Sequence, residues 1–308
     1  MDNKMRNRID ANNGYGRDGL KCKCIMIQGT ASSAGKSMMV AALCRILADL
    51  GYKVRPFKAQ NMSSNVYVTK DRLEMANAQA LQALAARVEP DVNMNPILLK
   101  PLGDYKSSVV ILGKEYKVMH ARDYYRFAIS KGLSIVLSSL HHLASNSDVV
   151  VIEGAGSPAE INIARYDIAN MRLAEAIGAP VLIVSDIERG GCFASMIGTL
   201  ALLKRKERDL VRGFIINKFR GDASILVGAL SRFERMSSKR VLGIIPFIDD
   251  LALPEEDSLS SRKGYGSANA LTHDKSQYND LDMMIDRLSK VVKNSIAMDE
   301  VMKILDIR

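Results

Sequence analysis

Tryptophan is absent from this 308-residue chain, and aromatic residues make up only 6% of it. This scarcity argues against a nucleic-acid surface that stacks bases on aromatic rings. The four cysteines are too few and too irregularly spaced for a secreted disulfide framework or a zinc finger. No apolar run reaches the roughly 18 residues of a membrane-spanning helix, and residues 1–20 lack the apolar centre of a signal peptide. These absences predict a cytoplasmic protein without nucleic-acid or membrane partners.

The composition is otherwise that of a globular protein, with 47% hydrophobic and 25% charged residues. Lys and Arg number 43 against 34 Asp and Glu, which gives a net charge of +9. Such an excess favours anionic partners, and because the aromatic partners of a nucleic-acid surface are scarce, phosphates and polycarboxylates fit it better.

Short apolar runs alternate with longer helical patterns, as expected for an α/β fold with a mostly parallel sheet flanked by helices. The predicted strands are Cys24–Gln28, Val54–Lys58, Ser108–Leu112, Val149–Glu153, Val181–Ser185, Gly213–Asn217 and Leu242–Ile245. The predicted helices are Lys36–Leu50, Leu73–Arg87, Ala121–Ala144, Phe193–Leu203 and Ala223–Phe233. Strand runs such as DVVVIE and PVLIVS are apolar without alternation, which indicates burial on both faces.

The pattern divides the chain into one main domain and less regular ends. Residues 1–22 are a polar lead-in that we expect to be disordered, and residues 23–254 form the main domain. Residues 255–280 are polar and aperiodic, which predicts a flexible linker. Residues 281–308 predict a C-terminal helix that either docks a partner or covers an edge of the sheet.

A Gly-rich segment has the composition of a phosphate-binding loop; it consists of Gly29, Thr30, Ala31, Ser32, Ser33, Ala34, Gly35, Lys36 and Ser37. It lies between an apolar run and a helical pattern, which is the context that a Walker A loop requires. Its spacing, Gly-x5-Gly-Lys-Ser, is one residue longer than the common pattern. We expect backbone N–H groups to bind the phosphates of ATP. Lys36 would neutralise phosphate oxygens and the Ser37 hydroxyl would bind Mg²⁺.

A buried strand that ends in a carboxylate predicts the second half of the metal site. Residues 148–153 read DVVVIE and are followed by Gly-Ala-Gly. In a nucleotide site, a carboxylate at such a strand end holds the metal directly or through water. Many buried strands end in an acid, so the prediction that Glu153 binds Mg²⁺ rests on its combination with the loop.

The loop and the segment IEGAG resemble those of the dethiobiotin synthetase-like P-loop enzymes. Further segments narrow the match: PFKAQNMSSN (Pro56–Asn65), MNPILLKP (Met94–Pro101), EGAGSPAEIN (Glu153–Asn162), SDIERGGCFAS (Ser185–Ser195), INKFRGD (Ile216–Asp222) and LPEEDS (Leu253–Ser258). From about Ile25 to Ser258, the chain resembles the synthetase domain of the cobyric acid synthases, the amidoligases of cobalamin biosynthesis.

This resemblance implies a P-loop NTPase fold and an ATP- and Mg²⁺-dependent ligase that forms C–N bonds. The implied substrate is a corrinoid, adenosylcobyrinic acid a,c-diamide, whose b, d, e and g carboxylates are amidated through acyl phosphates to give adenosylcobyric acid. A carboxylate is a poor electrophile, so ATP must activate it before ammonia displaces phosphate. Positioning charge around the phosphoryl group is then the main task of the protein.

Positions that follow strands supply further candidates, because this fold presents ligand-binding groups there. Catalytic roles are expected for Lys36, Lys58, Gln60, Asn61 and Glu74. Substrate contacts are expected for Asn61, Asn162, Asp167, Asn170, Asp186 and Arg189. The resemblance implies that Glu74 and Gln79 face the γ-phosphate and the metal, and that Asn217 and Lys218 bind the nucleotide. An ordinary surface or turn residue is the alternative for several of these positions.

Members of this family usually carry a second domain that hydrolyses glutamine and is marked by a Gly-x-Cys-x-Gly elbow. The nearest approach, Gly190–Ala194, lies inside a synthetase segment, and no cysteine follows Ser258. We therefore expect ammonia to come from a separate glutamine amidotransferase subunit or from solution. A homodimer is left open.

Two other functions are compatible with the loop. One is a related amidoligase such as cobyrinic acid a,c-diamide synthase, against which the segment Pro56–Asn65 argues. The other is a non-enzymatic nucleotide switch of the partitioning type. Such switches typically carry an extra lysine at the start of the loop, where this chain has Gly29 and Thr30.

Overall fold

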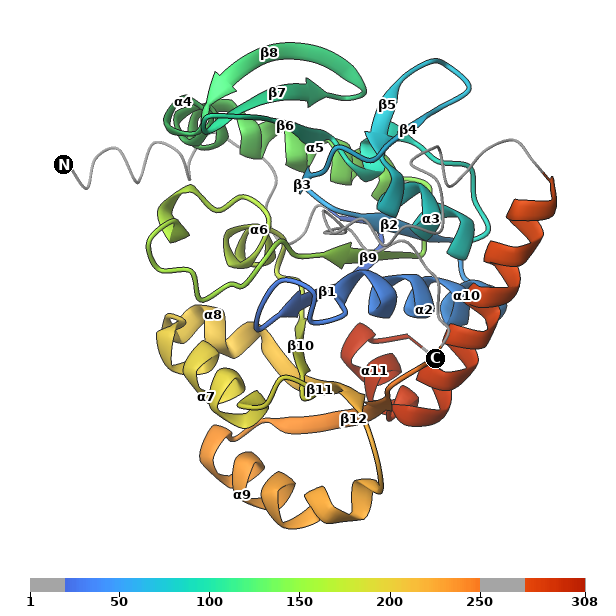
Figure 1. The fold of residues 1–308 in the computed structure, drawn as a ribbon, viewed down its shortest axis with the longest axis vertical. Coiled ribbons are helices and arrows are strands. Elements are labelled where there is room, and N and C mark those ends of the chain that lie inside the picture. The colour runs from blue at the N-terminus through green and yellow to red at the C-terminus, as the bar shows by residue number, and fades with distance from the viewer. Residues whose placement is uncertain (1–19, 250–274, 308) are drawn as a thin grey trace.

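A six-stranded parallel sheet forms the centre of the computed structural model, which describes residues 20–249 and 275–307 (Figure 1). The strand order is β12-β11-β10-β1-β9-β2, and every neighbouring pair is parallel. The strands are β1 (Lys23–Gly29), β2 (Val54–Phe57), β9 (Val149–Glu153), β10 (Val181–Asp186), β11 (Val211–Phe219) and β12 (Arg240–Pro246). The predicted α/β fold is confirmed.

Helices cover both faces of this sheet, which explains why its strands are apolar without alternation. Ile25 and Ile27 of β1 pack in the core of one face, and Met26 packs in the core of the other, because successive strand side chains point to opposite faces. The first face is covered by α2 (Lys36–Asp49), most of α3 (Asn77–Ala85), α10 (Lys275–Ser295) and α11 (Met298–Leu305). The second is covered by α4 (Ala121–Phe127), α5 (Leu133–Ala144), α6 (Met171–Ile177), α7 (Cys192–Leu202) and α9 (Val227–Ser237); the short α8 (Arg205–Leu210) precedes β11.

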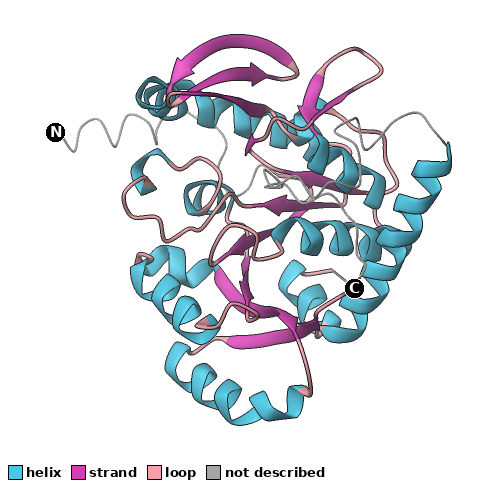
Figure 2. Cartoon of the chain, in the orientation of Figure 1, coloured by secondary structure: helices cyan, strands magenta, loops and turns pink. Residues whose placement is uncertain are grey.

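A second, mostly antiparallel sheet lies beyond β2, and most of its strands were not predicted (Figures 1 and 2). Its order is β3-β6-β7-β8, in which only β3 and β6 pair in parallel. The strands are β3 (Gln60–Met62), β6 (Ile97–Gly103), β7 (Lys106–Ile111) and β8 (Lys114–His120). The predicted strand Ser108–Leu112 therefore belongs to β7 of this sheet and not to the parallel one.

A hairpin also changes the start of one predicted helix. Residues Glu74–Ala76 form β5 and pair with β4 (Val66–Val68), so the helix expected from Leu73 begins at Asn77 instead. The predicted helix Ala121–Ala144 is likewise divided, because a π-helical turn at Ala128–Gly132 separates α4 from α5.

The C-terminal segment packs as two helices on the main domain. Helix α10 begins at Lys275 and ends at Ser295. Ile296 then pairs with Gly243 of β12 before α11 begins. Leu281, Ile285, Leu288, Val292, Val301 and Leu305 are buried in the core of the α2 face. The segment thus packs on the α2 face of the sheet and pairs with the edge strand β12 through Ile296, while docking of a partner stays a prediction. The polar lead-in up to residue 19, and residues 255–274 of the predicted linker, lie outside the described residues.

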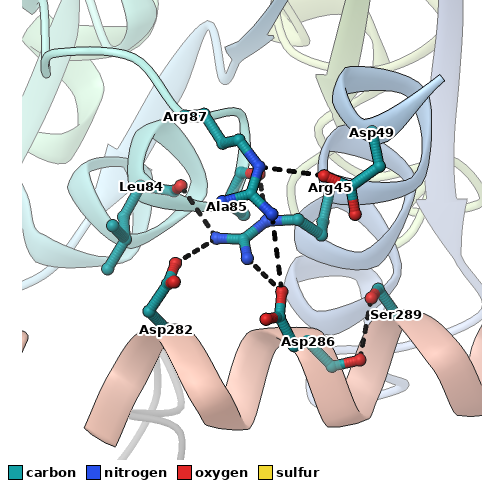
Figure 3. A network of polar contacts seen from close by, with 8 residues as sticks. All are labelled: Arg45, Asp49, Leu84, Ala85, Arg87, Asp282, Asp286 and Ser289. Carbon is teal, nitrogen blue, oxygen red and sulfur yellow. Dashed lines mark hydrogen bonds and ion pairs between the residues drawn. The ribbon is translucent and has the colours of Figure 1, made fainter. Parts of the chain in front are cut away.

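A buried arginine ties α10 to α2 (Figure 3). Arg45 of α2 is 0% exposed and pairs with both Asp282 and Asp286 of α10. It also donates from Nε to the Ala85 carbonyl over 2.9 Å and from Nη2 to the Leu84 carbonyl over 3.2 Å. One guanidinium thus joins α2, the end of α3 and α10. None of the helices within the described residues is long and apolar enough to cross a membrane.

Candidate functional site

The phosphate-loop segment connects β1 to α2, as its sequence context predicts. Gly35 has a φ of +103°, a left-handed conformation that favours glycine. A Cβ atom there would lie 2.0 Å from Nδ2 of Asn217, which donates to the Ala34 carbonyl over 3.0 Å. The Lys36 ammonium donates to the Ala31 carbonyl over 3.0 Å. The hydrogen bonds from Lys36 and Asn217 to loop carbonyl groups therefore stabilise the conformation of the loop.

Replacing Gly35 with alanine is expected to abolish nucleotide binding. The new methyl group would collide with the Asn217 amide, and an L-residue at this φ is strained. Titration with a fluorescent ATP analogue measures the effect. Gly51→Ala is the matched control for strain alone, because Gly51 also has a positive φ of +93° but meets nothing within 4 Å. Equal loss of binding in the two variants would contradict the steric explanation.

A buried polar cluster lies directly beside the loop, at the carboxyl end of β9. Glu153 is 0% exposed, and its Oε1 accepts from Ser37 Oγ over 2.8 Å and from Lys58 Nζ over 2.9 Å. Its Oε2 accepts from Nε2 of Gln82. Lys58 is 2% exposed. Strands β1, β9 and β2 are adjacent in the sheet, so three separate segments deliver Ser37, Glu153 and Lys58 to one point.

The cluster keeps Glu153 ionised although it is buried. Burial by itself opposes the charged form, but the Lys58 ammonium and the hydrogen bonds from Lys58, Gln82 and Ser37 outweigh it and hold the pKa of Glu153 below its ordinary value. A buried ionised carboxylate 2.8 Å from a hydroxyl is a donor set that fits Mg²⁺, which commonly takes one or two protein oxygens and completes its shell with water and phosphate oxygens. Ser37 and Glu153 would hold the ion.

The lowered pKa of Glu153 predicts how the free energy of unfolding depends on acidic pH. A carboxyl group whose pKa falls on folding stabilises the protein above its unfolded pKa of about 4.3, and this stabilisation is lost as the pH falls through the folded value. We therefore expect the free energy of unfolding to decline below about pH 4. Urea unfolding at pH 3 to 7 measures this, and Glu153→Gln should remove part of the decline. An unchanged slope in that variant would show that other carboxyl groups cause it.

Several predicted nucleotide contacts come together around the loop. Asn217 and Lys218 both reach it, since the Lys218 ammonium donates to the Ser33 carbonyl over 2.9 Å. Lys218 also pairs with Asp186 over 3.1 Å. The predicted substrate residue Asp186 therefore lies beside Lys218, a predicted nucleotide contact.

The structure does not bring Glu74 to this cluster. Glu74 lies on β5 and not on a helix. Its carboxylate pairs with Lys100 over 2.8 Å and is 34% exposed. Among the described residues it makes no polar contact with Ser37 or Glu153, so the geometry does not support its predicted catalytic and metal-binding roles. Gln79 contacts Asn61 over 2.6 Å, and it is Gln82, one turn later, that contacts Glu153.

A cavity of about 420 Å³ opens between the second sheet and the segment that follows β9. Its walls are mostly apolar and carry four tyrosines: Tyr105, Tyr124, Tyr125 and Tyr166. Gln60 lines it and accepts from Tyr124 Oη over 2.6 Å. Few polar groups on mostly apolar walls are typical of small-molecule sites.

Two of the predicted substrate residues, Asp167 and Asn170, line this cavity. Asp167 accepts from the backbone N–H groups of Ala169 and Asn170, and Asn170 bonds to the backbone of Ala155, so both also shape the loop. Of the other four, Asn61 contacts Gln79 and Asp186 pairs with Lys218. Asn162 and Arg189 are exposed and make no polar contact within the described residues.

Sequence reasoning missed Gln82 and Tyr124. The signal for Gln82 is its spacing of three residues from Gln79, which puts the two amides on one face of α3. Tyr124 carried no signal, because its partner Gln60 is 64 positions away in the chain.

Comparison with known proteins agrees with the geometry. Residues 25–260 match the model of the CobQ/CobB/MinD/ParA nucleotide binding domain. The cobyric acid synthase of Dehalococcoides mccartyi is 48% identical over 87% of this chain and 51% of its own length. That of Caldanaerobacter subterraneus subsp. tengcongensis is 54% identical over 77% of this chain and 46% of its own length.

A probable cobyric acid synthase of Methanothermobacter thermautotrophicus is 50% identical over 80% of this chain and 49% of its own length. The chain thus spans about half the length of the curated relatives it matches. The predicted resemblance to cobyric acid synthases is confirmed. Since the family model covers residues 25–260, this chain belongs to the CobQ/CobB/MinD/ParA nucleotide-binding domain family.

Proposed function

We propose that this chain is an ATP-dependent amidoligase that converts peripheral carboxylates of a corrinoid, adenosylcobyrinic acid a,c-diamide, to amides. The observation that carries the proposal is the buried cluster of Ser37, Lys58 and Glu153 beside the phosphate loop. Simple nucleotide binding needs the hydroxyl and the carboxylate, whereas the buried second lysine offers a cation for a second anionic group. The names of the curated relatives indicate which substrate supplies that group.

In the proposed reaction, a substrate carboxylate oxygen attacks the γ-phosphorus of ATP and the bond to ADP breaks. Ammonia then attacks the carbonyl carbon of the acyl phosphate and forms the C–N bond. The C–O bond to phosphate breaks, phosphate leaves, and the nitrogen loses one proton. Bound Mg²⁺ would neutralise phosphate charge. Lys36 stabilises the transferring phosphoryl group, and Lys58 orients the substrate carboxylate for in-line attack.

The apolar cavity is the proposed site of the corrinoid edge. It is lined by Ala155, two residues after Glu153, and by Gln60, two residues after Lys58. We propose that a carboxylate on a ligand held there reaches the cluster. The tyrosine walls suit a large, partly apolar ring, and the hydroxyl of Tyr124 fixes the Gln60 amide as a polar contact for a side arm. Asp167 and Asn170 would contact amides of the same ligand.

The test is an assay of the purified chain with ATP, Mg²⁺ and cobyrinic acid a,c-diamide in its adenosylated form. Mass spectrometry counts the carboxylates that become amides, with ammonium or glutamine as the sole nitrogen donor. We expect turnover with ammonium and none with glutamine alone, since a separate amidotransferase subunit or free ammonium is the proposed nitrogen source. Ser37→Ala should lose activity, and the exposed Ser134→Ala is the control.

Other outcomes of this assay point to the alternatives. Amidation of cobyrinic acid itself in preference to the a,c-diamide would favour a cobyrinic acid a,c-diamide synthase. Phosphate release that responds to DNA and not to a corrinoid would favour a nucleotide switch. Robust turnover with glutamine alone would contradict the proposed nitrogen source.

A further inference from the structure

Gln82 is a buried glutamine that contacts Glu153, the carboxylate proposed to bind Mg²⁺. It lies on α3, is 1% exposed and donates from Nε2 to Oε2 of Glu153. The opposite oxygen of the same carboxylate receives Ser37 and Lys58. Glu153 is therefore held at both oxygens, by a hydroxyl and an ammonium on one side and by a neutral amide on the other.

The orientation of the Gln82 amide follows from its partner. An ionised carboxylate only accepts hydrogen bonds, so Nε2 must face Glu153. This leaves the side-chain carbonyl of Gln82 buried and without a hydrogen-bond partner among the described residues. An unsatisfied buried carbonyl is unfavourable, so the contact to Glu153 is kept at the expense of local stability.

The neutrality of Gln82 matters at a cation site. Lys58 offsets the negative charge of Glu153, and a second cation at Oε2 would leave little attraction for a metal ion. An amide fixes the plane of the carboxylate while leaving its charge in place. The backbone that carries Gln82 is itself fixed, because Leu81 and Leu84 of α3 pack in the same core as α2.

We infer that Gln82 is a positioning residue that orients Glu153 for Mg²⁺ and so sets the metal affinity of the site. The inference rests on the proposed function, in which Ser37 and Glu153 hold the ion. It concerns Gln82 and not Gln79, which lies one turn earlier, is 0% exposed and contacts Asn61 instead. Asn77, at the start of α3, is also a buried amide, at 4% exposed, but makes no contact with Glu153 among the described residues, so it serves as the comparison.

The test is the replacement Gln82→Met, with Asn77→Leu as the matched control. Calorimetric titration of Mg²⁺ into protein loaded with a non-hydrolysable ATP analogue gives the metal affinity. We expect Gln82→Met to bind Mg²⁺ about 10–100-fold more weakly, the usual effect of removing a group that orients a metal ligand. Its affinity for the analogue in EDTA should be unchanged, as should the Mg²⁺ affinity of Asn77→Leu.

Equal Mg²⁺ affinity in Gln82→Met and the wild type would overturn the inference. Equal weakening in Gln82→Met and Asn77→Leu would also overturn it, because it would show a general effect of altering α3. If Gln82→Met does not fold, Gln82→Asn keeps an amide but is one methylene too short and should show the same loss. A wild type without any Mg²⁺-dependent nucleotide binding would contradict the proposed function itself, whereas tight Mg²⁺ binding by Gln82→Met contradicts only the inference.

Discussion

Replacing Lys58 with methionine is expected to lower the free energy of unfolding at neutral pH by about 3–5 kcal/mol, the usual cost of breaking a buried ion pair from one side. Lys58 and Glu153 are 2% and 0% exposed, so the remaining carboxylate could not reach water. It would have to stay charged in the interior or take up a proton. Urea unfolding followed by circular dichroism measures the loss, and amidation should be abolished in the same variant.

Two controls separate charge from packing at this site. Lys100→Met breaks a half-exposed pair with Glu74, for which we expect at most about 1 kcal/mol. The double variant Lys58→Met, Glu153→Gln removes both charges and should regain part of the lost stability without regaining activity. If the double variant is less stable than Lys58→Met alone, the buried charge is not the cause of the loss.

Neutralising both partners of Arg45 is the second substitution with a large expected effect. Asp282→Asn combined with Asp286→Asn leaves the 0% exposed guanidinium without a counter-ion, although its bonds to the Ala85 and Leu84 carbonyls remain. We expect the free energy of unfolding to fall by about 3 kcal/mol. Hydrogen exchange should also become faster along α10, since that helix loses its ionic contact with α2 (Figure 3).

Asp280 provides the matched control for this substitution. It lies on the same helix, is exposed and makes no contact with Arg45, so Asp280→Asn should change stability by no more than about 0.5 kcal/mol. Wild-type stability in the Asp282, Asp286 double variant would show that the backbone carbonyls alone satisfy Arg45.

The parallel sheet and the phosphate loop could be predicted from the sequence because each depends on local pattern. Apolar runs buried on both faces identified all six strands of that sheet, and the strand–loop–helix order identified the loop around Lys36. The second sheet could not be predicted in the same way. Its strand β8 is exposed along most of its length, and β3 has three residues, too few for a periodic signal.

Site residues could be predicted where a single functional group stands at the end of a strand. They could not be predicted where a role depends on contact between two residues far apart in the chain. Glu153 followed from its position at the end of β9. Glu74 did not behave as expected because pairing with β4 overrode the helical pattern around it. Gln82 and Tyr124 gain their roles only from partners far along the chain, and a single sequence does not reveal such pairs.

The position of α10 on α2 has a consequence for the order in which the chain can mature. Asp282 and Asp286 lie 237 and 241 positions after Arg45, so this contact has one of the largest sequence separations in the molecule. Contacts of this kind form late, because closing long loops is entropically costly. During synthesis, α2, which carries Lys36 and Ser37, is made more than two hundred residues before α10. Until α10 is made, Arg45 has neither of its two aspartate partners. A nascent chain should therefore acquire firm nucleotide binding only after α10 has left the ribosome.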